Sequence, residues 1–242
     1  MKKLGNIELV AKKIALPLII LAAGASSRWG KPKQLLPWRG QTLLERALQV
    51  GLESGASPLI LVLGAWRQEI ERVCPQLQRE GAPWRLYFNP HWSQGMASSL
   101  RVGLEGALQL APQAPGVLIH LADLPLVEAA LVRRVAQAAL SSPQPTKALA
   151  FPQYGGRRGH PVYIGRAYWP QLLELQGDEG ARSIIKANPR YWRSVELESE
   201  VPWLDCDTPE SYRLCLERAE GRSPLESDFL GELGVREDGA RP

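Results

Sequence analysis

Short apolar runs alternate along this chain with longer stretches in which apolar residues recur at helical spacing. The runs are rich in branched residues and are too short for typical helices, which indicates strands within a sheet. The predicted strands lie at residues 18–23, 58–63, 84–88, 116–122, 148–151, 162–164 and 192–197. Strands that alternate with helices in this way predict an α/β fold.

Helical spacing is clearest after Thr42. Thr42 can cap a helix, Glu45 stands three residues further on as in a capping box, and Gly55 can end it. Further helices are predicted at residues 66–74, from 96 onward, at 126–140, at 177–187 and after 208. We expect one three-layer α/β/α domain with a mostly parallel sheet, and a late hairpin-like insertion near 148–164 that covers the functional edge.

The two ends of the chain lack this pattern. Residues 1–16 are weakly patterned and read as a lead-in, and after Ala219 the chain turns polar with little to bury. The prediction is therefore one domain at 17–219, preceded by the lead-in and followed by a flexible tail at 220–242.

Composition narrows the class of protein. The chain has 242 residues, 45% of them apolar, and a formal net charge of +4. No dense basic tract is interleaved with aromatic residues, so no nucleic-acid partner is predicted. Cys74, Cys206 and Cys215 are scattered without metal-ligand spacing, which fits a reducing, cytoplasmic location.

The start of the chain superficially resembles a signal peptide, because Met1-Lys2-Lys3 precedes an apolar stretch. Glu8 and Lys12 interrupt that stretch, and cleavage near Ala25 would destroy the loop described next. No apolar run approaches membrane-spanning length, so no membrane association is predicted.

The first predicted strand, 18–23, breaks at Gly24 into a loop of small and basic residues. The loop contains Ala25, Ser26, Ser27, Arg28, Gly30, Lys31 and Lys33. Small residues let backbone N–H groups approach an anion, and the basic side chains add charge, so the loop suits a phosphate group. It is neither a P-loop nor a dinucleotide fingerprint, because neither spacing is present. For Gly24 alone, a plain strand-to-helix connection stays open.

Two later segments carry candidate polar groups. Asn89 and Gly95 precede a predicted helix whose start carries Ser98 and Ser99, which suits either a ligand or an ordinary capped helix. Asp123 follows the strand at 116–122, at the edge where parallel sheets bind ligands, although aspartate also caps helices. His120, inside that strand, is expected to be a core residue.

Three more segments follow. Glycines and two arginines at 155–159 suit an anionic substrate or a solvated hairpin tip. Asp178 and Glu179 suit the start of a helix by the helix dipole. Asp207 or Thr208 can cap the last helix.

Taken together, these strings resemble the MobA-like nucleotidyltransferases. The chain carries the N-terminal signature L-A-A-G-x-S-x-R-x-G-x-x-K-x-L-L-P, with Trp29 where the family often has Met. Further motifs follow in the family's order, namely N-P-x-x-x-x-G-M-x-S-S-L, L-A-D-x-P, G-x-x-G-H-P, G-D-x-G-A-R and D-x-D-T-P. The resemblance spans about 18–216 and implies a Rossmann-like nucleotidyltransferase fold of the GT-A-like kind.

The resemblance also implies residue roles. The nucleotide-binding residues would be Leu21, Ala22, Ala23, Gly24, Ser26, Ser27, Arg28, Lys33, Asn89, Ser98 and Ser99. The acceptor side would comprise Gly95, Met96, Gly159, His160, Pro161 and Arg182. Arg28, Lys33 and Asp123 would be catalytic, and Asp123 with Asp207 would hold Mg²⁺.

Within the family the chain is most similar to members that transfer CMP to the molybdenum cofactor, because guanylyl relatives tend to carry Gly at the position of Ala23. The implied substrates are CTP and molybdenum-loaded molybdopterin, with an apo-molybdoenzyme or its chaperone as a further partner. Guanylyl transfer, nucleotidyl transfer to another small phosphate, and non-catalytic molybdopterin carriage remain alternatives. A dinucleotide-dependent redox enzyme is disfavoured by the missing fingerprint.

Overall fold

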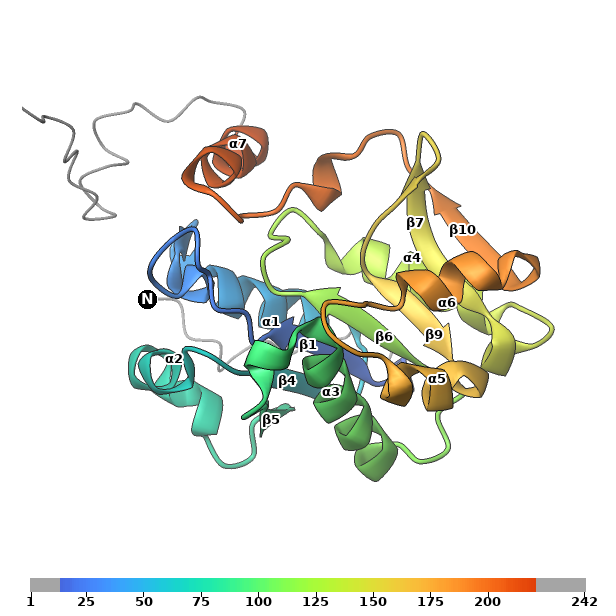
Figure 1. Ribbon diagram of the computed structural model, residues 1–242. Helices are drawn as coiled ribbons and strands as arrows, with labels where there is room; N and C mark the ends of the chain where they lie inside the picture. The colour runs from blue at the N-terminus through green and yellow to red at the C-terminus, as the bar shows by residue number, and fades with distance from the viewer. Residues whose placement is uncertain (1–13, 221–242) are drawn as a thin grey trace, which may run out of the picture.

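The computed structural model describes residues 14–220, which form a mixed sheet with helices on both faces (Figure 1). The sheet order is β10-β7-β9-β6-β1-β4-β5, with β8 paired to β7. Pairings among β5, β4, β1 and β6 are parallel, as is β10 with β7, whereas β9 runs antiparallel to both β6 and β7. The predicted mostly parallel α/β fold is therefore confirmed.

The strands follow the predicted apolar runs closely. They are β1 Leu18–Ala22, β4 Leu59–Leu63, β5 Trp84–Phe88, β6 Gly116–Leu121, β7 Leu149–Tyr154, β8 Arg157–Arg158, β9 Val162–Gly165 and β10 Trp192–Glu196. β1 and β4 are buried at every position, as expected of central parallel strands covered on both faces. A small separate hairpin, β2 Pro37–Trp38 with β3 Gln41–Thr42, was not predicted.

The helices are α1 Leu43–Ser54, α2 Arg67–Val73, α3 Met96–Leu110, α4 Ala129–Leu140, α5 Trp169–Glu174, α6 Arg182–Ala187 and α7 Pro209–Glu220. The capping box predicted for α1 is present, since Thr42 and Glu45 exchange side-chain and backbone hydrogen bonds and Gly55 ends the helix in the left-handed conformation. α5 was not predicted.

The predicted helix at 177–187 is wrong at its start. α6 begins only at Arg182, because residues 177–181 form turns that dock on α3 instead. The carbonyl of Gly177 accepts from the Ala97 N–H, and Asp178 Oδ1 accepts from the Met96 N–H at 3.3 Å. Asp178 thus caps α3 and not its own helix.

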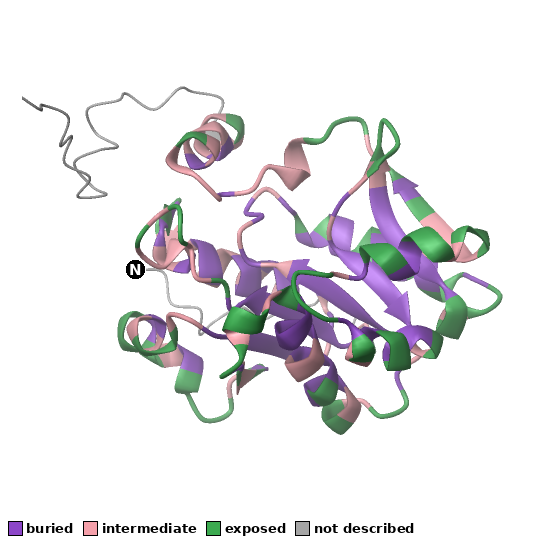
Figure 2. Cartoon of the chain, viewed as in Figure 1, coloured by how far each residue is buried: buried purple, intermediate pink, exposed green. Residues whose placement is uncertain are grey.

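Two apolar layers hold the sheet between the helices (Figure 2). In one layer, α1 and α4 pack on the face of the sheet to which Leu18 and Ile20 of β1 point. In the other, α3, α5 and α6 pack on the opposite face, to which Ile19 and Leu21 point. His120 is 1% exposed within the sheet, so the prediction of a core histidine is confirmed. Burial lowers its pKa to about 3, which keeps the ring neutral.

A third, smaller cluster joins α7 to the segment after β1. It contains Leu36, Trp38, Leu43, Cys206, Tyr212 and Cys215. The predicted lead-in and tail lie almost wholly outside the described residues. Within residues 14–220, none of the helices has the length and apolar character needed to cross a bilayer.

Candidate active site

A cleft of about 1260 Å³ opens where β1 and β6 end. Its walls come from the loop after β1, the start of α3, the loop before β9, the segment leading into α6, and the segment before α7. The carboxyl edge of a parallel sheet is where α/β folds bind ligands, because strand ends and loops converge there. The tertiary fold therefore brings together segments as distant as Gly24 and Asp207.

An ion-pair cluster occupies one end of the cleft. Lys33 Nζ lies 2.6 Å from Asp123 Oδ2 and 2.5 Å from Asp207 Oδ1, and Arg28 donates to Asp207 Oδ2 at 2.9 Å. The Lys33 and Asp123 side chains are only 14% and 19% exposed, whereas Arg28 is 65% exposed at the rim. Lys33 thus lies at the centre of the cluster and contacts both carboxylates.

The ion pairs shift the pKa values of Lys33 and Asp207. Burial alone would lower the pKa of Lys33, but Asp123 and Asp207 outweigh that effect and hold it above its usual value. Burial alone would raise the pKa of Asp207, but Lys33 and Arg28 together hold it below its usual range. Lys33 and Asp207 are therefore both charged near neutral pH.

Gln34 orders the loop from inside, and its role was not predicted. Its side-chain amide donates to the carbonyls of Ala22 at 2.9 Å and Gly24 at 3.3 Å, and its oxygen accepts from the Ser26 hydroxyl. The same hydroxyl accepts from the Lys33 backbone N–H. Because Gln34 is 3% exposed, it fixes the strand end and the loop with little freedom. Its position inside the signature, directly after Lys33, was the available signal.

The segment around Cys206 and Tyr212 packs against the loop that follows β1. Trp29 Nε1 donates to the Cys206 carbonyl at 3.0 Å, and its ring meets that of Tyr212 edge-on at 5.8 Å. The Tyr212 hydroxyl donates to the Pro37 carbonyl, and the Cys206 N–H donates to the Asp123 carbonyl. These contacts place Asp207 beside the loop.

The start of α3 forms another wall. Asn89 is 1% exposed, and its side-chain nitrogen donates to the hydroxyls of Ser98 at 2.8 Å and Ser99 at 2.9 Å. Ser99 lines the cleft, whereas Asn89 and Ser98 lie behind it. Asn89 thus supports the wall through its hydrogen bond to Ser99, and its role in nucleotide binding stays a prediction.

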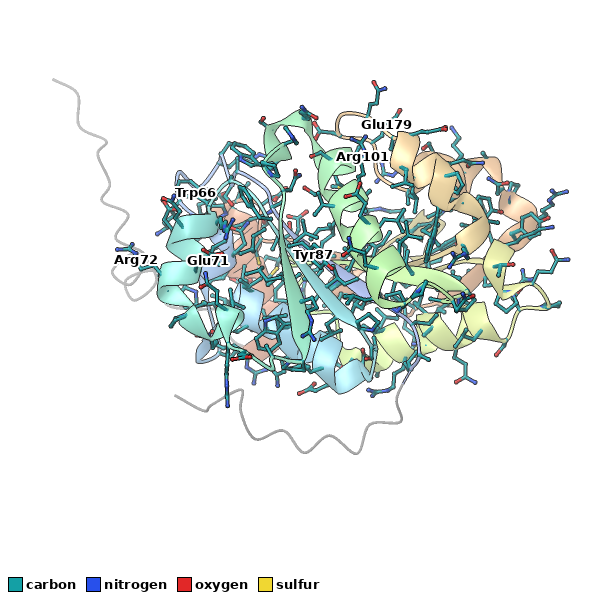
Figure 3. All side chains as sticks on the ribbon, turned by 90° about the horizontal axis from the view of Figure 1, so that it is seen from below. Trp66, Glu71, Arg72, Tyr87, Arg101 and Glu179 are labelled. Carbon is teal, nitrogen blue, oxygen red and sulfur yellow. The ribbon has the colours of Figure 1, made fainter. Side chains whose placement is uncertain are left out.

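Three cations line the other end of the cleft, namely Arg158, Arg182 and Lys186. Arg158 stacks on the Trp192 ring at 4.1 Å, and Trp192 Nε1 donates to the Ile185 carbonyl, which ties Arg158 to α6. No ion pair engages these three cations within residues 14–220. The acidic Glu179 also lines this end (Figure 3 labels it on the loop before α6).

Strand alternation separates the two arginines of the glycine-rich loop. Arg157 is exposed and pairs with Glu200, as the solvated hairpin tip would predict, whereas Arg158 faces the cleft. The sequence pointed to the arginine pair but not to which member faces inward.

Trp203 covers Gly159 closely. A Cβ at Gly159 would lie 1.8, 2.0 and 2.2 Å from three atoms of the indole five-membered ring, and so directly over its face. Trp203 Nε1 is buried without a hydrogen-bond partner among the described residues. His160 also lines this wall, where its Nδ1 lies 3.3 Å from the Ile119 carbonyl, and burial lowers the pKa of its ring.

Most residues singled out from the sequence meet at this cleft. Those that line it are Leu21, Ala22, Ala23, Gly24, Ser27, Lys33, Gly95, Met96, Ser99, Asp123, Gly159, His160, Arg182 and Asp207. Those that do not are Ser26, Arg28, Asn89, Ser98 and Pro161. Ser26, Arg28, Asn89 and Ser98 nevertheless form hydrogen bonds with lining residues.

The donor set suits a hard divalent cation, although the described residues contain no cluster of three or more metal-ligating side chains. Asp123 Oδ1 is buried and has no hydrogen-bond partner among residues 14–220. Two converging carboxylates, one with an unused oxygen, fit the oxygen preference of such ions, which commonly add substrate phosphates as further ligands.

A sheet edge with a small-residue loop and a lysine between two carboxylates suits a ligand that carries phosphate groups. The chain belongs to the MobA-like NTP transferase domain family, which matches residues 18–194. It is 34% identical to a nicotine blue oxidoreductase from Paenarthrobacter nicotinovorans, over 81% of this chain and 94% of that protein. It is 27% identical to the molybdenum cofactor cytidylyltransferase of Escherichia coli strain K12, over 84% and 97%.

Solved structures agree with this placement. The crystal structure of Rv0371c from Mycobacterium tuberculosis H37Rv superimposes with a TM-score of 0.69 at 31% identity, covering 84% of this chain and 99% of that one. A manganese complex of Rv0371C gives a TM-score of 0.67 at 30% identity with the same coverage.

Proposed function

We propose that this protein transfers CMP from CTP to the terminal phosphate of molybdenum-loaded molybdopterin and releases pyrophosphate. The observation that carries the proposal is Lys33, held between Asp123 and Asp207 beside the phosphate-type loop, in a cleft whose far end is cationic. The 27% identity to a molybdenum cofactor cytidylyltransferase supports the choice of substrates.

The proposed reaction needs positioning and charge compensation more than a protein nucleophile. An oxygen of the acceptor phosphate attacks the α-phosphorus of CTP, a new phosphoanhydride bond forms, and the bond to pyrophosphate breaks. Backbone N–H groups at 23–27 would cradle the triphosphate, and Lys33 with Arg28 would neutralise it.

Asp123 and Asp207 would hold the divalent cation, which we propose to be Mg²⁺. When bound, that ion would supply Lewis-acid stabilisation of phosphate oxygens. Gln34 keeps the loop in shape, and Trp29 with Tyr212 keeps Asp207 in place. The chain's own contribution is thus a rigid frame around the reacting phosphates.

The decisive experiment is pyrophosphate release with Mg²⁺ and molybdenum-loaded molybdopterin, with CTP and GTP in parallel. We expect release with CTP and little with GTP. Release with GTP alone would keep the transfer chemistry and overturn the assignment of the base. Acceptor binding without release from either nucleotide would favour a molybdopterin carrier.

A reductase is the second candidate, because the nicotine blue oxidoreductase is more similar to this chain, at 34% identity, than the cytidylyltransferase is at 27%. The two are separated by one parallel assay. Loss of nicotine blue absorbance with NADH or NADPH, without pyrophosphate release in the first assay, would favour the reductase.

The cationic end of the cleft should select the acceptor. We expect Arg158→Ala to raise the KM for molybdopterin about tenfold, since it removes one charge-assisted contact, and to leave the KM for CTP unchanged. Arg190→Ala is the matched control, because Arg190 also stacks on an aromatic ring, that of Tyr191 at 4.6 Å, but lies outside the cleft. Steady-state kinetics with each substrate varied in turn measures both constants. Equal effects of the two variants would remove Arg158 from acceptor binding.

A further inference from the structure

Lys33 occupies the position between Asp123 and Asp207 that a cation bound by both carboxylates would take. Its ammonium contacts one oxygen of each carboxylate, at 2.6 and 2.5 Å, and the Lys33 side chain is only 14% exposed. Arg28 satisfies the second oxygen of Asp207. The two carboxylates that face each other across the cluster are therefore matched by two cations of the chain itself.

We propose that Lys33 is an internal competitor for the divalent cation, so that the site accepts the cation together with a triphosphate and rejects the free ion. The inference rests on the proposed function only in taking a metal–triphosphate complex as the ligand. It concerns which form of the ligand the site selects, and it does not depend on the base or the acceptor.

Charge exchange explains the selection. A free divalent ion would have to displace the Lys33 ammonium from two short ion pairs, and the displaced ammonium would lose its partners in a poorly solvated position. A triphosphate that arrives with the ion supplies phosphate oxygens for the same ammonium. Lys33 would then leave the carboxylates for the phosphates with its hydrogen bonds preserved.

The surroundings favour such an exchange over a permanent structural ion pair. Asp123 Oδ1 remains buried and unpaired among the described residues, so the cluster leaves a strong acceptor unused. The backbone N–H of Lys33 is fixed by Ser26, and Gln34 beside it is anchored to the strand end. The side chain can therefore change partners while the loop that carries it stays in place.

Binding of Mn²⁺ alone tests the proposal, because it uses neither nucleotide nor acceptor. We expect the wild type to bind Mn²⁺ weakly and Lys33→Met to bind it at least about tenfold more tightly, measured from the electron paramagnetic resonance signal of free Mn²⁺. Adding CTP should reverse the order, since Lys33→Met lacks the partner for the phosphates.

Lys186→Met is the matched control, because it removes the same charge from an exposed position of the same cleft, on α6, where it pairs with neither carboxylate. The Mn²⁺ affinity of Lys186→Met should stay within about threefold of the wild type, since an exposed charge is screened by solvent and salt. A Lys33→Met variant that binds Mn²⁺ no more tightly than wild type overturns the proposal.

A second measurement covers poor folding of the variant. Without Lys33 the two carboxylates repel, so added Mn²⁺ should raise the Tm of Lys33→Met more than that of the wild type. Equal Tm shifts would also overturn the proposal. Failure of pyrophosphate release in the substrate assays would instead reject the proposed function and leave these two outcomes unaffected.

Discussion

Asp123→Ala is expected to lower the rate of pyrophosphate release by roughly 10²–10³, the usual cost of removing one preorganised electrostatic group. Asp123 stands at the end of β6, where it faces Lys33 and carries an unpaired buried oxygen. Under the proposed function it holds the divalent cation. The chain should still fold, because Lys33 keeps Asp207 as a partner and no buried charge is left alone.

Asp205→Asn is the neighbouring comparison for this experiment. Asp205 lines the same cleft, but its Oδ1 accepts from the Asp207 backbone N–H, a contact that asparagine preserves. The rate of pyrophosphate release by Asp205→Asn should stay within about tenfold of the wild-type rate, far above the rate of Asp123→Ala. Circular dichroism checks the fold of both variants. More than half of wild-type activity in Asp123→Ala would remove Asp123 from the metal site.

Gly95→Ala is expected to have the second largest effect. Gly95 has φ +97° and ψ 178°, a region that only glycine adopts freely, and substitution there costs about 1–3 kcal/mol in strain. A Cβ would also lie 2.3 Å from the carbonyl carbon of Gly177, and such overpacking adds about 1–3 kcal/mol. The clash is with backbone, so the docked loop must move.

Displacement of the loop at residues 177–181 should also change the part of the cleft that is proposed to bind the acceptor. Arg182 and Lys186 follow the loop directly on α6, so a shift moves them away from their positions. We expect the KM for molybdopterin to rise about tenfold or more, because small misplacements of positioning groups are costly. Denaturant unfolding measures the stability loss, and steady-state kinetics measures the KM.

Gly177→Ala is the matched control for Gly95→Ala. Gly177 also has a positive φ, +58°, but a Cβ there meets nothing within 4 Å. Gly177→Ala should lose only about 1–2 kcal/mol of stability, the cost of a left-handed alanine, and the KM for molybdopterin should change little. If both variants lost equal stability and kept the wild-type KM for molybdopterin, the close packing of Gly95 against Gly177 would not contribute to acceptor binding.

The local elements were predictable because their signals are local. The branched runs at β1 and β4 identify buried strands, and the Thr42 capping box with Gly55 fixes both ends of α1. The loop after β1, with its small residues, Arg28 and Lys33, predicts a phosphate-binding site from residues that are neighbours in the sequence. Resemblance to the MobA-like family added the order of motifs, and the family assignment was correct.

The partners of those side chains were decided only by the tertiary structure. That Lys33 links Asp123 and Asp207, that Arg158 and not Arg157 faces the cleft, and that residues 177–181 cap α3 all depend on contacts between segments far apart in the chain. Such contacts carry no sequence period. They arise because strand ends and loops converge at one edge of the sheet, and there charge pairing and close backbone packing settle each side chain's place.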